Sequence, residues 1–229
     1  MLAPLPPTFA TTRDALHALA CYAIAPARKA VDGHIGLRAT DGGFGTPPLP
    51  DGTVLRVRHD RLVRGDAIDE PITTIRAACK LVGVEPSADP GVGADLPPFA
   101  PDELLDVDAA AGAALGSWYA YVEGVLSEAA KRLGPASEAQ LWPEHFDLAC
   151  DWGRDDVARL NLGGSPGDSY SAVPYLYAGP WQREILTAGD AFWNAPFGAV
   201  VTYDELLAAA EPLARGSDLF VEAAEHLQR

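Results

Sequence analysis

The chain has only three cysteines, and none of them forms a CxxC pair. Cys21, Cys79 and Cys150 are far apart and each follows apolar residues, which indicates buried, reduced thiols and favours a cytoplasmic protein over a secreted disulfide scaffold. The first residues lack a basic segment followed by an apolar run, and no stretch approaches the roughly 18 apolar residues of a membrane helix. We therefore expect neither a signal peptide nor a membrane span.

Basic residues are scarce in the second part of the chain. Residues 1–80 contain ten Lys and Arg against eight Asp and Glu, whereas residues 81–229 contain seven against twenty-four, and the net charge is −15. Such an acidic surface repels phosphate backbones and anionic lipids, so nucleic-acid and membrane partners are not expected. The exception is a basic cluster, which could bind an anion or an acidic partner or form the solvated face of a hairpin: Arg56, Arg58, His59, Arg61 and Arg64.

Secondary-structure signals in the first part alternate between helix and strand. Apolar spacing and a capping box predict a helix over 12–24 that ends before Pro26. Alternating residues predict strands over 34–40, 53–59 and 61–65, while the glycines and prolines of "DGGFGTPPLPDG" exclude regular structure between the first two. A helix is expected over 72–83, and the Pro/Gly-rich segment 85–102 reads as a linker or a surface strap.

The second part predicts a long core helix over 104–133, stopped by Gly134. Strands follow in "HFDLACDW", "VARLNLGG", "PYLYAGPW" and "FGAVVTYDEL", and a closing helix capped by Ser217 ends the chain. Strands separated from helices favour an α+β fold, with an antiparallel sheet built from two strand clusters and packed by the long central helix and shorter flanking helices. We expect a single domain over 1–229, with a possible two-part organisation of 11–84 and 103–229.

The stretch "QLWPEHFDLACDW" is dense in aromatic and acidic residues. If 145–152 is a strand, Phe146, Leu148, Cys150 and Trp152 face the core, and His145, Asp147 and Asp151 face outward. The register that keeps apolar residues together pairs Trp152 with Ala158, Cys150 with Leu160 and Leu148 with Leu162, and it sets Asp151 opposite Arg159 as a cross-strand ion pair. His145 and Asp147 then share a face, spaced to hold a metal or a substrate together.

Other motifs are less specific. "GGSPGD" at 163–168 matches no nucleotide-binding loop and no nucleophile elbow, so a rigid turn that places Asp168 and Tyr170 is the natural interpretation. The aromatic residues of "PYLYAGPW" and "FWNAPFG" either close the open end of a core or line a concave pocket. No motif indicates a cofactor, and a monomer and a homodimer are equally compatible with the sequence.

The leading hypothesis is the binding of a small, partly apolar ligand in an aromatic-lined pocket. Its walls would be Trp142, Tyr175, Tyr177, Trp181 and Trp193, and its polar groups Asp147, Asp168 and Asn194. One alternative is a metal-assisted or acid/base hydrolase that uses His145, Asp147 and Asp168. Another is a protein-interaction module that docks through the Arg56 to Arg64 face.

The order of several motifs resembles an uncharacterised bacterial family, a domain of unknown function. The shared features are a T-x-P hairpin, an "F-x-x-H-x-L" strand pair, a "W-x-x-F-D-L-A" strand and an "F-Y-A-Y-x-x-P" strand. The matching residues here are Thr46, Pro47, His59, Leu62, Trp142, Phe146, Asp147, Leu148, Ala149, Tyr175, Tyr177 and Pro180. The resemblance spans most of 12–227, implies one continuous domain and no known activity, and gives His145 no counterpart.

Overall fold

The computed structural model describes residues 2–94, 96–154, 158–187 and 190–227 and shows an α+β fold, as predicted. The chain divides into two compact units. Unit 1 comprises Met1–Pro4, Tyr121–Gln140 and Asp147–Arg229, and unit 2 comprises Leu5–Ala120 and Leu141–Phe146. The boundaries do not follow segment 85–102, which lies inside unit 2, where Phe99 packs on Tyr22. The single-domain organisation stays a prediction.

The first helical run of unit 2 is longer than predicted. It consists of α1 (Phe9–Leu19), the π-helical turn η1 (Ala20–Ile24) and α2 (Ala25–Asp32). The expected end before Pro26 is wrong, because the helical run continues through Pro26, which lies in the first turn of α2 directly after the π-helical turn. The Tyr22 carbonyl, four residues before Pro26, accepts from the Cys79 thiol at 3.2 Å. The helix α3 (Ile75–Val82) begins at the N-cap Thr74 and ends at left-handed Gly83, as expected from the glycine.

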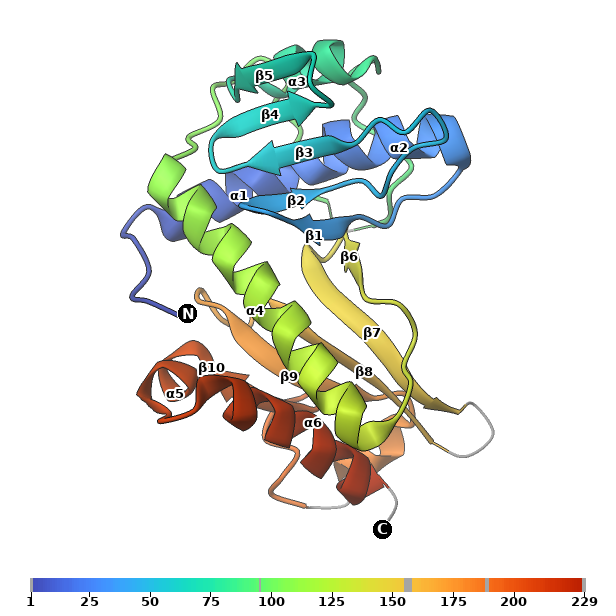
Figure 1. Ribbon diagram of the computed structural model, residues 1–229, viewed down its shortest axis with the longest axis vertical. Helices are drawn as coiled ribbons and strands as arrows, with labels where there is room; N and C mark the ends of the chain where they lie inside the picture. Colours follow the sequence, from blue (N-terminus) through green and yellow to red (C-terminus); the bar gives the residue numbers. More distant parts are fainter. Residues whose placement is uncertain (1, 95, 155–157, 188–189, 228–229) are drawn as a thin grey trace. The chain divides into compact units, whose positions relative to one another are not determined.

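A five-stranded antiparallel sheet in the order β1-β2-β3-β4-β5 completes unit 2. Its strands are β1 (Arg38–Thr40), β2 (Gly43–Gly45), β3 (Leu55–Arg58), β4 (Arg61–Arg64) and β5 (Ile68–Pro71). In Figure 1 the run from α1 to α2 lies behind these strands. The strand β2 contradicts the expectation that 41–52 has no regular structure. Its glycines permit this pairing, since a Cβ atom on Gly43 would collide with the carbonyl oxygen of Val57 on β3.

Phe146 completes the core of unit 2. Its ring stacks on His17 with 5.0 Å between centroids and meets Phe44 and Tyr119 edge-on. The hydroxyl of Tyr119 donates to the Phe146 carbonyl at 2.7 Å. Phe146 has a φ of +54°, an unusual conformation for a bulky residue, so these contacts hold it in a strained turn.

The long helix α4 (Ala109–Leu133) begins five residues later than predicted. The Asp108 carboxylate accepts from the Ala111 amide at 2.9 Å and thereby caps the start, which leaves Leu104 outside the helix and 81% exposed. Gly134, with a φ of +83°, follows the last turn as expected. Residues of α4 up to Ala120 belong to unit 2 and those from Tyr121 onward to unit 1.

The second strand cluster forms a separate five-stranded antiparallel sheet in the order β10-β9-β8-β7-β6. Its strands are β6 (Gln140–Trp142), β7 (Asp147–Arg154), β8 (Ala158–Ser165), β9 (Tyr175–Pro180) and β10 (Ala199–Thr202). The remaining elements are η2 (Arg183–Thr187), α5 (Tyr203–Ala208) and α6 (Pro212–Leu227). The expected cap at Ser217 is wrong, because Ser217 is buried within α6.

The β7–β8 register differs from the predicted one by two residues. Trp152 pairs with Leu160, Cys150 with Leu162 and Leu148 with Gly164. The strand β7 continues to Arg154, two residues beyond the predicted end at Trp152. Apolar residues still face one another, which explains why hydrophobic pairing alone did not distinguish the two registers.

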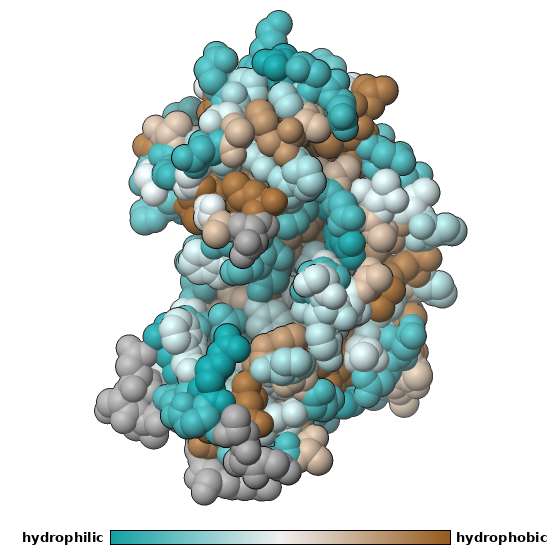
Figure 2. All heavy atoms as spheres, turned by 180° about the vertical axis from the view of Figure 1, so that it is seen from behind, coloured by the Kyte–Doolittle hydropathy of each residue, from teal (hydrophilic) through white to brown (hydrophobic). Residues whose placement is uncertain are grey.

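No helix of the described residues is both long enough and apolar enough to span a membrane. Among the described residues, large apolar side chains with substantial exposure include Leu104, which precedes α4, and Leu213 in α6. On the face displayed in Figure 2, hydrophobic residues are interspersed with hydrophilic ones.

Candidate functional site

The second sheet has one face turned toward helices and one turned away from them. Leu176 of β9 lies on the first face, where a Cβ atom on Gly216 of α6 would come within 2.8 Å of it. Ala149, Gly163, Tyr177 and Val200 form one cross-strand row on the opposite face. Ser165 and Tyr175 belong to the next row of that face, and Asp147 lies two residues before Ala149 and so shares it. The candidate site is on this face.

Tyr177 reaches across Gly163 to Asp147. Its hydroxyl donates a hydrogen bond to Oδ2 of the carboxylate, which is only 9% exposed. A Cβ atom on Gly163 would lie 2.9 Å from that hydroxyl oxygen and 2.7 Å from Cβ of Ala149. Gly163 therefore leaves the space that the phenol crosses, and the strand glycine is part of the site.

Tyr175 holds the second carboxylate of this face. Its hydroxyl donates to Oδ2 of Asp168 at 2.6 Å, and the Ser165 hydroxyl donates to the same oxygen at 3.1 Å. The amides of Tyr170 and Ser171 donate to Oδ1 at 2.8 and 3.3 Å. Four donors thus fix the Asp168 carboxylate at the start of an exposed loop. The turn predicted over 163–168 is shorter than expected, because its first three residues belong to β8.

Four aromatic rings gather beside these carboxylates. Tyr170 meets Phe197 at 4.9 Å and Tyr175 at 5.3 Å between ring centroids, and Tyr175 lies 6.3 Å from Tyr177. Tyr175 is buried, whereas Tyr170 is 45% exposed. The cluster therefore has a closed inner end and an edge that is open to solvent.

Both phenols, of buried Tyr175 and half-buried Tyr177, are hydrogen-bond donors over the whole physiological pH range. Burial is the main cause that raises the pKa of Tyr177 well above its ordinary value, and the nearby Asp147 carboxylate adds to this. Burial and the hydrogen bond to Asp168 raise the pKa of Tyr175 in the same direction. Neutral phenols beside carboxylates stabilise the negative charge of the carboxylates without cancelling it.

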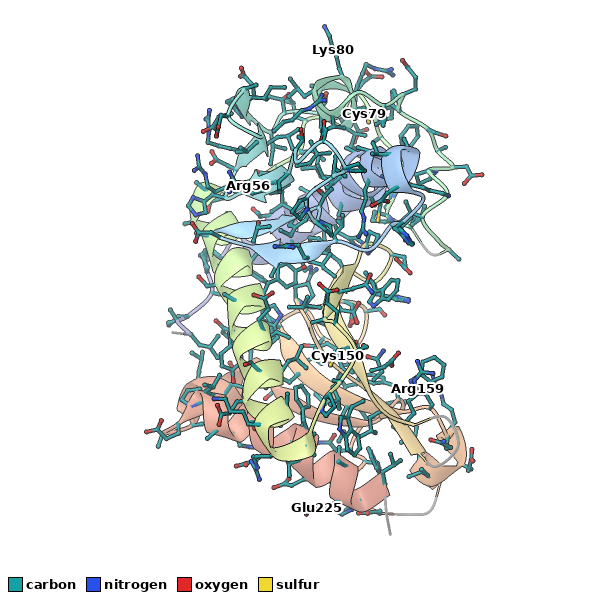
Figure 3. The ribbon with its side chains drawn as sticks, turned by 45° about the vertical axis from the view of Figure 1, so that its right-hand side comes forward. Arg56, Cys79, Lys80, Cys150, Arg159 and Glu225 are labelled. Atoms are coloured by element: carbon teal, nitrogen blue, oxygen red, sulfur yellow. The ribbon has the colours of Figure 1, made fainter. Side chains whose placement is uncertain are left out.

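Trp181, a predicted pocket wall, lies in a different group. It is 56% exposed, and its indole N–H donates to Asp151 at 3.1 Å. Arg159, labelled in Figure 3, lies over the Trp181 ring at 4.2 Å and pairs with Asp151 at 2.6 Å. The predicted ion pair of Asp151 and Arg159 is therefore confirmed, although the two residues are diagonal neighbours and Asn161 is directly opposite Asp151.

Trp193 and Asn194 form a third group. The Asn194 amide exchanges two hydrogen bonds with the Val200 backbone, at 2.8 and 3.0 Å. Trp193 is buried and its ring lies 6.4 Å from that of His226, which stacks on Phe192. In this arrangement the Asn194 side chain completes a backbone turn.

Trp142 and His145 belong to unit 2, whereas Asp147 and Asp168 belong to unit 1. The prediction that His145 and Phe146 are part of a strand is wrong: both lie in a turn closed by the hydrogen bond from the Phe146 amide to the Trp142 carbonyl at 2.7 Å. His145 is exposed there. The strand begins only at Asp147 because the positive φ of Phe146 turns the chain away from extended geometry.

The three cysteines are free and buried, as predicted. Burial raises the pKa of Cys21 to about 12 and that of Cys150, seen within the sheet in Figure 3, to about 11, so neither is a reactive thiolate. Within the described ranges, no group of three or more His, Cys, Asp or Glu side chains has the arrangement of a metal site.

Sequence reasoning found the two carboxylates and the two tyrosines but missed Gly163. The available signal was the glycine pair at the end of an alternating strand, which indicates a close approach across the strand. Comparison with family models, curated proteins and solved structures finds no match to this chain. The resemblance to the uncharacterised bacterial family stays a prediction.

Proposed function

We propose that unit 1 binds a small, partly apolar ligand that carries a protonated amine. The amine would lie beside Asp168, next to the aromatic cluster of Tyr170, Tyr175, Tyr177 and Phe197. The observation that carries this proposal is the state of Asp168. Its carboxylate is fixed by two hydroxyl and two amide donors, and it takes part in no ion pair among the described residues. Its negative charge is held in place beside aromatic rings, an arrangement suited to an organic cation.

The apolar part of such a ligand would contact the open edge of the cluster. Tyr170 supports this, because its ring is 45% exposed while it packs against Tyr175 and Phe197. Trp142, Trp181, Trp193 and Asn194 are not included, since the structure gives them other contacts or places them in unit 2. Asp147 and Tyr177 would fix the inner end of the site.

A matched series of aryl amines and aryl carboxylic acids tests the proposal by ligand-observed NMR. The amines should bind and the acids should not, and Asp168→Asn should weaken amine binding about tenfold, since one charged hydrogen bond contributes about 1.5 kcal/mol or more. Tyr170→Ala should weaken it without affecting Asp168. The control is Asp151→Asn, an acid of the same sheet that is already paired with Arg159. Equal binding of acids and amines, or no effect of Asp168→Asn, would contradict the proposal.

We also propose a cytoplasmic location. The support is that the three cysteines are free and buried, which is the usual state of thiols in a reducing compartment. Gel filtration of the purified protein under reducing and oxidising conditions tests this together with the oligomeric state. The expected result is the same elution volume in both, corresponding to a monomer or a homodimer.

A further inference from the structure

The sheet of unit 2 has a basic face that the amine site does not involve. Two cross-strand rows define it. One row contains Arg38, Gly45 and Arg56, and the neighbouring row contains Thr40, Gly43 and Arg58. Side chains directly opposite one another in an antiparallel sheet share a face. On this face β2 contributes only glycines, so it adds no side chain between β1 and β3, which are about 10 Å apart. The stem of Arg56 lies against β2, because a Cβ atom on Gly45 would be 3.2 Å from Cγ of Arg56.

Arg38 and Arg56 have no ion-pair partner within the part of the chain that the structure describes. Arg58 and Arg61 differ from them, because both pair with Asp69 of β5. Arg38 is exposed and Arg56 is half-buried; Figure 3 shows Arg56 on β3. Two guanidinium groups without an acidic partner therefore lie on the two sides of Gly45.

Two polar atoms of the same face are buried without a hydrogen-bond partner in the described residues. They are Nε of Arg56 and Oγ1 of Thr40, on the two strands that flank β2. Buried polar atoms in native proteins nearly always have a partner, so a pair of such atoms on one face indicates a ligand that supplies acceptors. Both atoms can donate a hydrogen bond, and both would suit an oxyanion.

The surroundings restrict the size of the anion. Asp60, Asp69 and Glu70 lie near Arg61, and Asp41 follows Thr40 in the chain. With a net charge of −15 for the whole protein, these acids oppose a long polyanion such as RNA. A compact dianion that receives parallel hydrogen bonds from two guanidinium groups matches the site better.

We propose that the face formed by Arg38, Thr40 and Arg56 around Gly45 binds the phosphate group of a small ligand. The two arginines hold the phosphate oxygens, and the Thr40 hydroxyl donates to one of them. Gly43 and Gly45 add no side chain of their own to the floor of the site. This site is independent of the amine site in unit 1.

Isothermal titration calorimetry at constant ionic strength tests the proposal with inorganic phosphate and with methyl phosphate. The full-length protein should bind at least one of them, and Arg38→Gln and Arg56→Gln should each weaken binding about tenfold, as expected for the loss of a charged hydrogen bond. Tighter binding of methyl phosphate would identify a phosphate monoester as the ligand, and tighter binding of inorganic phosphate would identify the free anion.

Arg64→Gln is the matched control. Arg64 belongs to the same strand pair but lies opposite Leu55, on the other face, and should leave phosphate affinity within about twofold. If Arg56→Gln does not fold by circular dichroism, Arg38→Gln decides, because Arg38 is exposed and its loss removes no ion pair. The proposal is overturned if the wild-type protein binds neither phosphate at 10 mM, or if Arg38→Gln binds as well as wild type.

Discussion

The two sheets differ in the side chains that lie beside their strand glycines. Each has a strand that contains two glycines, β2 in unit 2 and β8 in unit 1. In unit 1 the space over Gly163 is crossed by the phenol of Tyr177, which bonds to Asp147. In unit 2 Gly45 lies between Arg38 and Arg56, and a Cβ atom on Gly45 would be 3.2 Å from Cγ of Arg56. In both sheets the strand glycine thus leaves room for a side chain of the neighbouring strand, Tyr177 beside Gly163 and Arg56 beside Gly45.

The largest expected loss of stability comes from adding a methyl group at the glycines of β2 and β8. Gly43→Ala should lower the free energy of unfolding by about 3 kcal/mol, because its Cβ atom would collide with the backbone of β3. Gly163→Ala should cost less, about 1 to 2 kcal/mol, since its nearest contacts, with Cβ of Ala149 and the Leu148 carbonyl oxygen, are 2.7 Å, whereas Gly43 would meet the Val57 carbonyl oxygen at 2.1 Å. Urea unfolding monitored by circular dichroism measures both.

Gly124→Ala is the control for that pair. Gly124 lies inside α4, and its Cβ atom would meet only the end of the Leu213 side chain, at 3.2 Å. Removing a glycine from a helix interior stabilises it by up to about 1 kcal/mol. A loss of stability in Gly124→Ala as large as in Gly43→Ala would mean that the close approach of β2 to β3 is not the cause.

The hydrogen bond across Gly163 should have the next largest effect. Tyr177→Phe leaves the buried Asp147 carboxylate without its phenol donor, and we expect a loss of about 2 kcal/mol in the free energy of unfolding. Tyr170→Phe is the matched control, because the Tyr170 ring is 45% exposed and should tolerate the change within about 0.5 kcal/mol. Equal losses in the two variants would show that the bond across the glycine does not stabilise unit 1.

A pH series separates the two units, since the buried His17 lies in unit 2. Burial lowers the pKa of His17, mainly by desolvation of the imidazolium, although hydrogen bonds to the Pro143 and Glu144 backbone act in the opposite direction. The unfolded state therefore binds more protons just below its own pKa of about 6.5. Stability should fall as the pH falls through 6.5, and it should become constant below the folded-state pKa.

Hydrogen exchange measured residue by residue at pH 7.5 and 5.5 tests this prediction. Protection should decrease around Phe146, which stacks on His17, more than in β8 of unit 1. His17→Gln should reduce this difference between the units. An unchanged pH profile in His17→Gln would assign the acid sensitivity to other groups.

The surface ion pairs should have the smallest effects and should be equivalent in the two sheets. Asp151→Asn removes the pair with Arg159 in unit 1, and Asp69→Asn removes the pairs with Arg58 and Arg61 in unit 2. Each should change the free energy of unfolding by less than about 1 kcal/mol, because water and salt screen exposed charges. Thermal unfolding at low and high salt measures both, and a loss above 2 kcal/mol in either would show that the pair is structural.

Periodicity predicted most elements of the fold because helices and half-buried strands repeat apolar residues at different spacings. It placed α3, β3, β4 and four of the five strands that follow α4, β7 to β10, close to their observed positions, and it did not predict β6. It failed where the backbone had an unusual conformation or the side chains gave no pattern. The π-helical turn before Pro26 and the glycine strand β2 are of this kind, and a left-handed Phe146 cannot be read from a sequence.

For the candidate site in unit 1, the sequence predicted several of the residues but not how they are arranged. Tyr175 and Tyr177 share a face because residues i and i+2 of a strand do, which the sequence shows directly. Asp147 lies on another strand, β7, so its position on the same face could not be read from this spacing. The pairing of Tyr177 with Asp147 depends on the β7–β8 register, which hydrophobic pairing left two residues out of place. Trp181 and Trp193 were grouped with the site because of residue type alone, and their positions depend on turns that type does not determine.

The course of the chain has a consequence for any attempt to produce the units as fragments. The backbone passes between them four times, at Pro4–Leu5, Ala120–Tyr121, Gln140–Leu141 and Phe146–Asp147. A fragment that stops at Ala120 lacks the peptide Leu141–Phe146, whose last ring packs against His17, Phe44 and Tyr119. No single cut releases either unit intact, and reconstitution of unit 2 would require that short peptide to be supplied in trans.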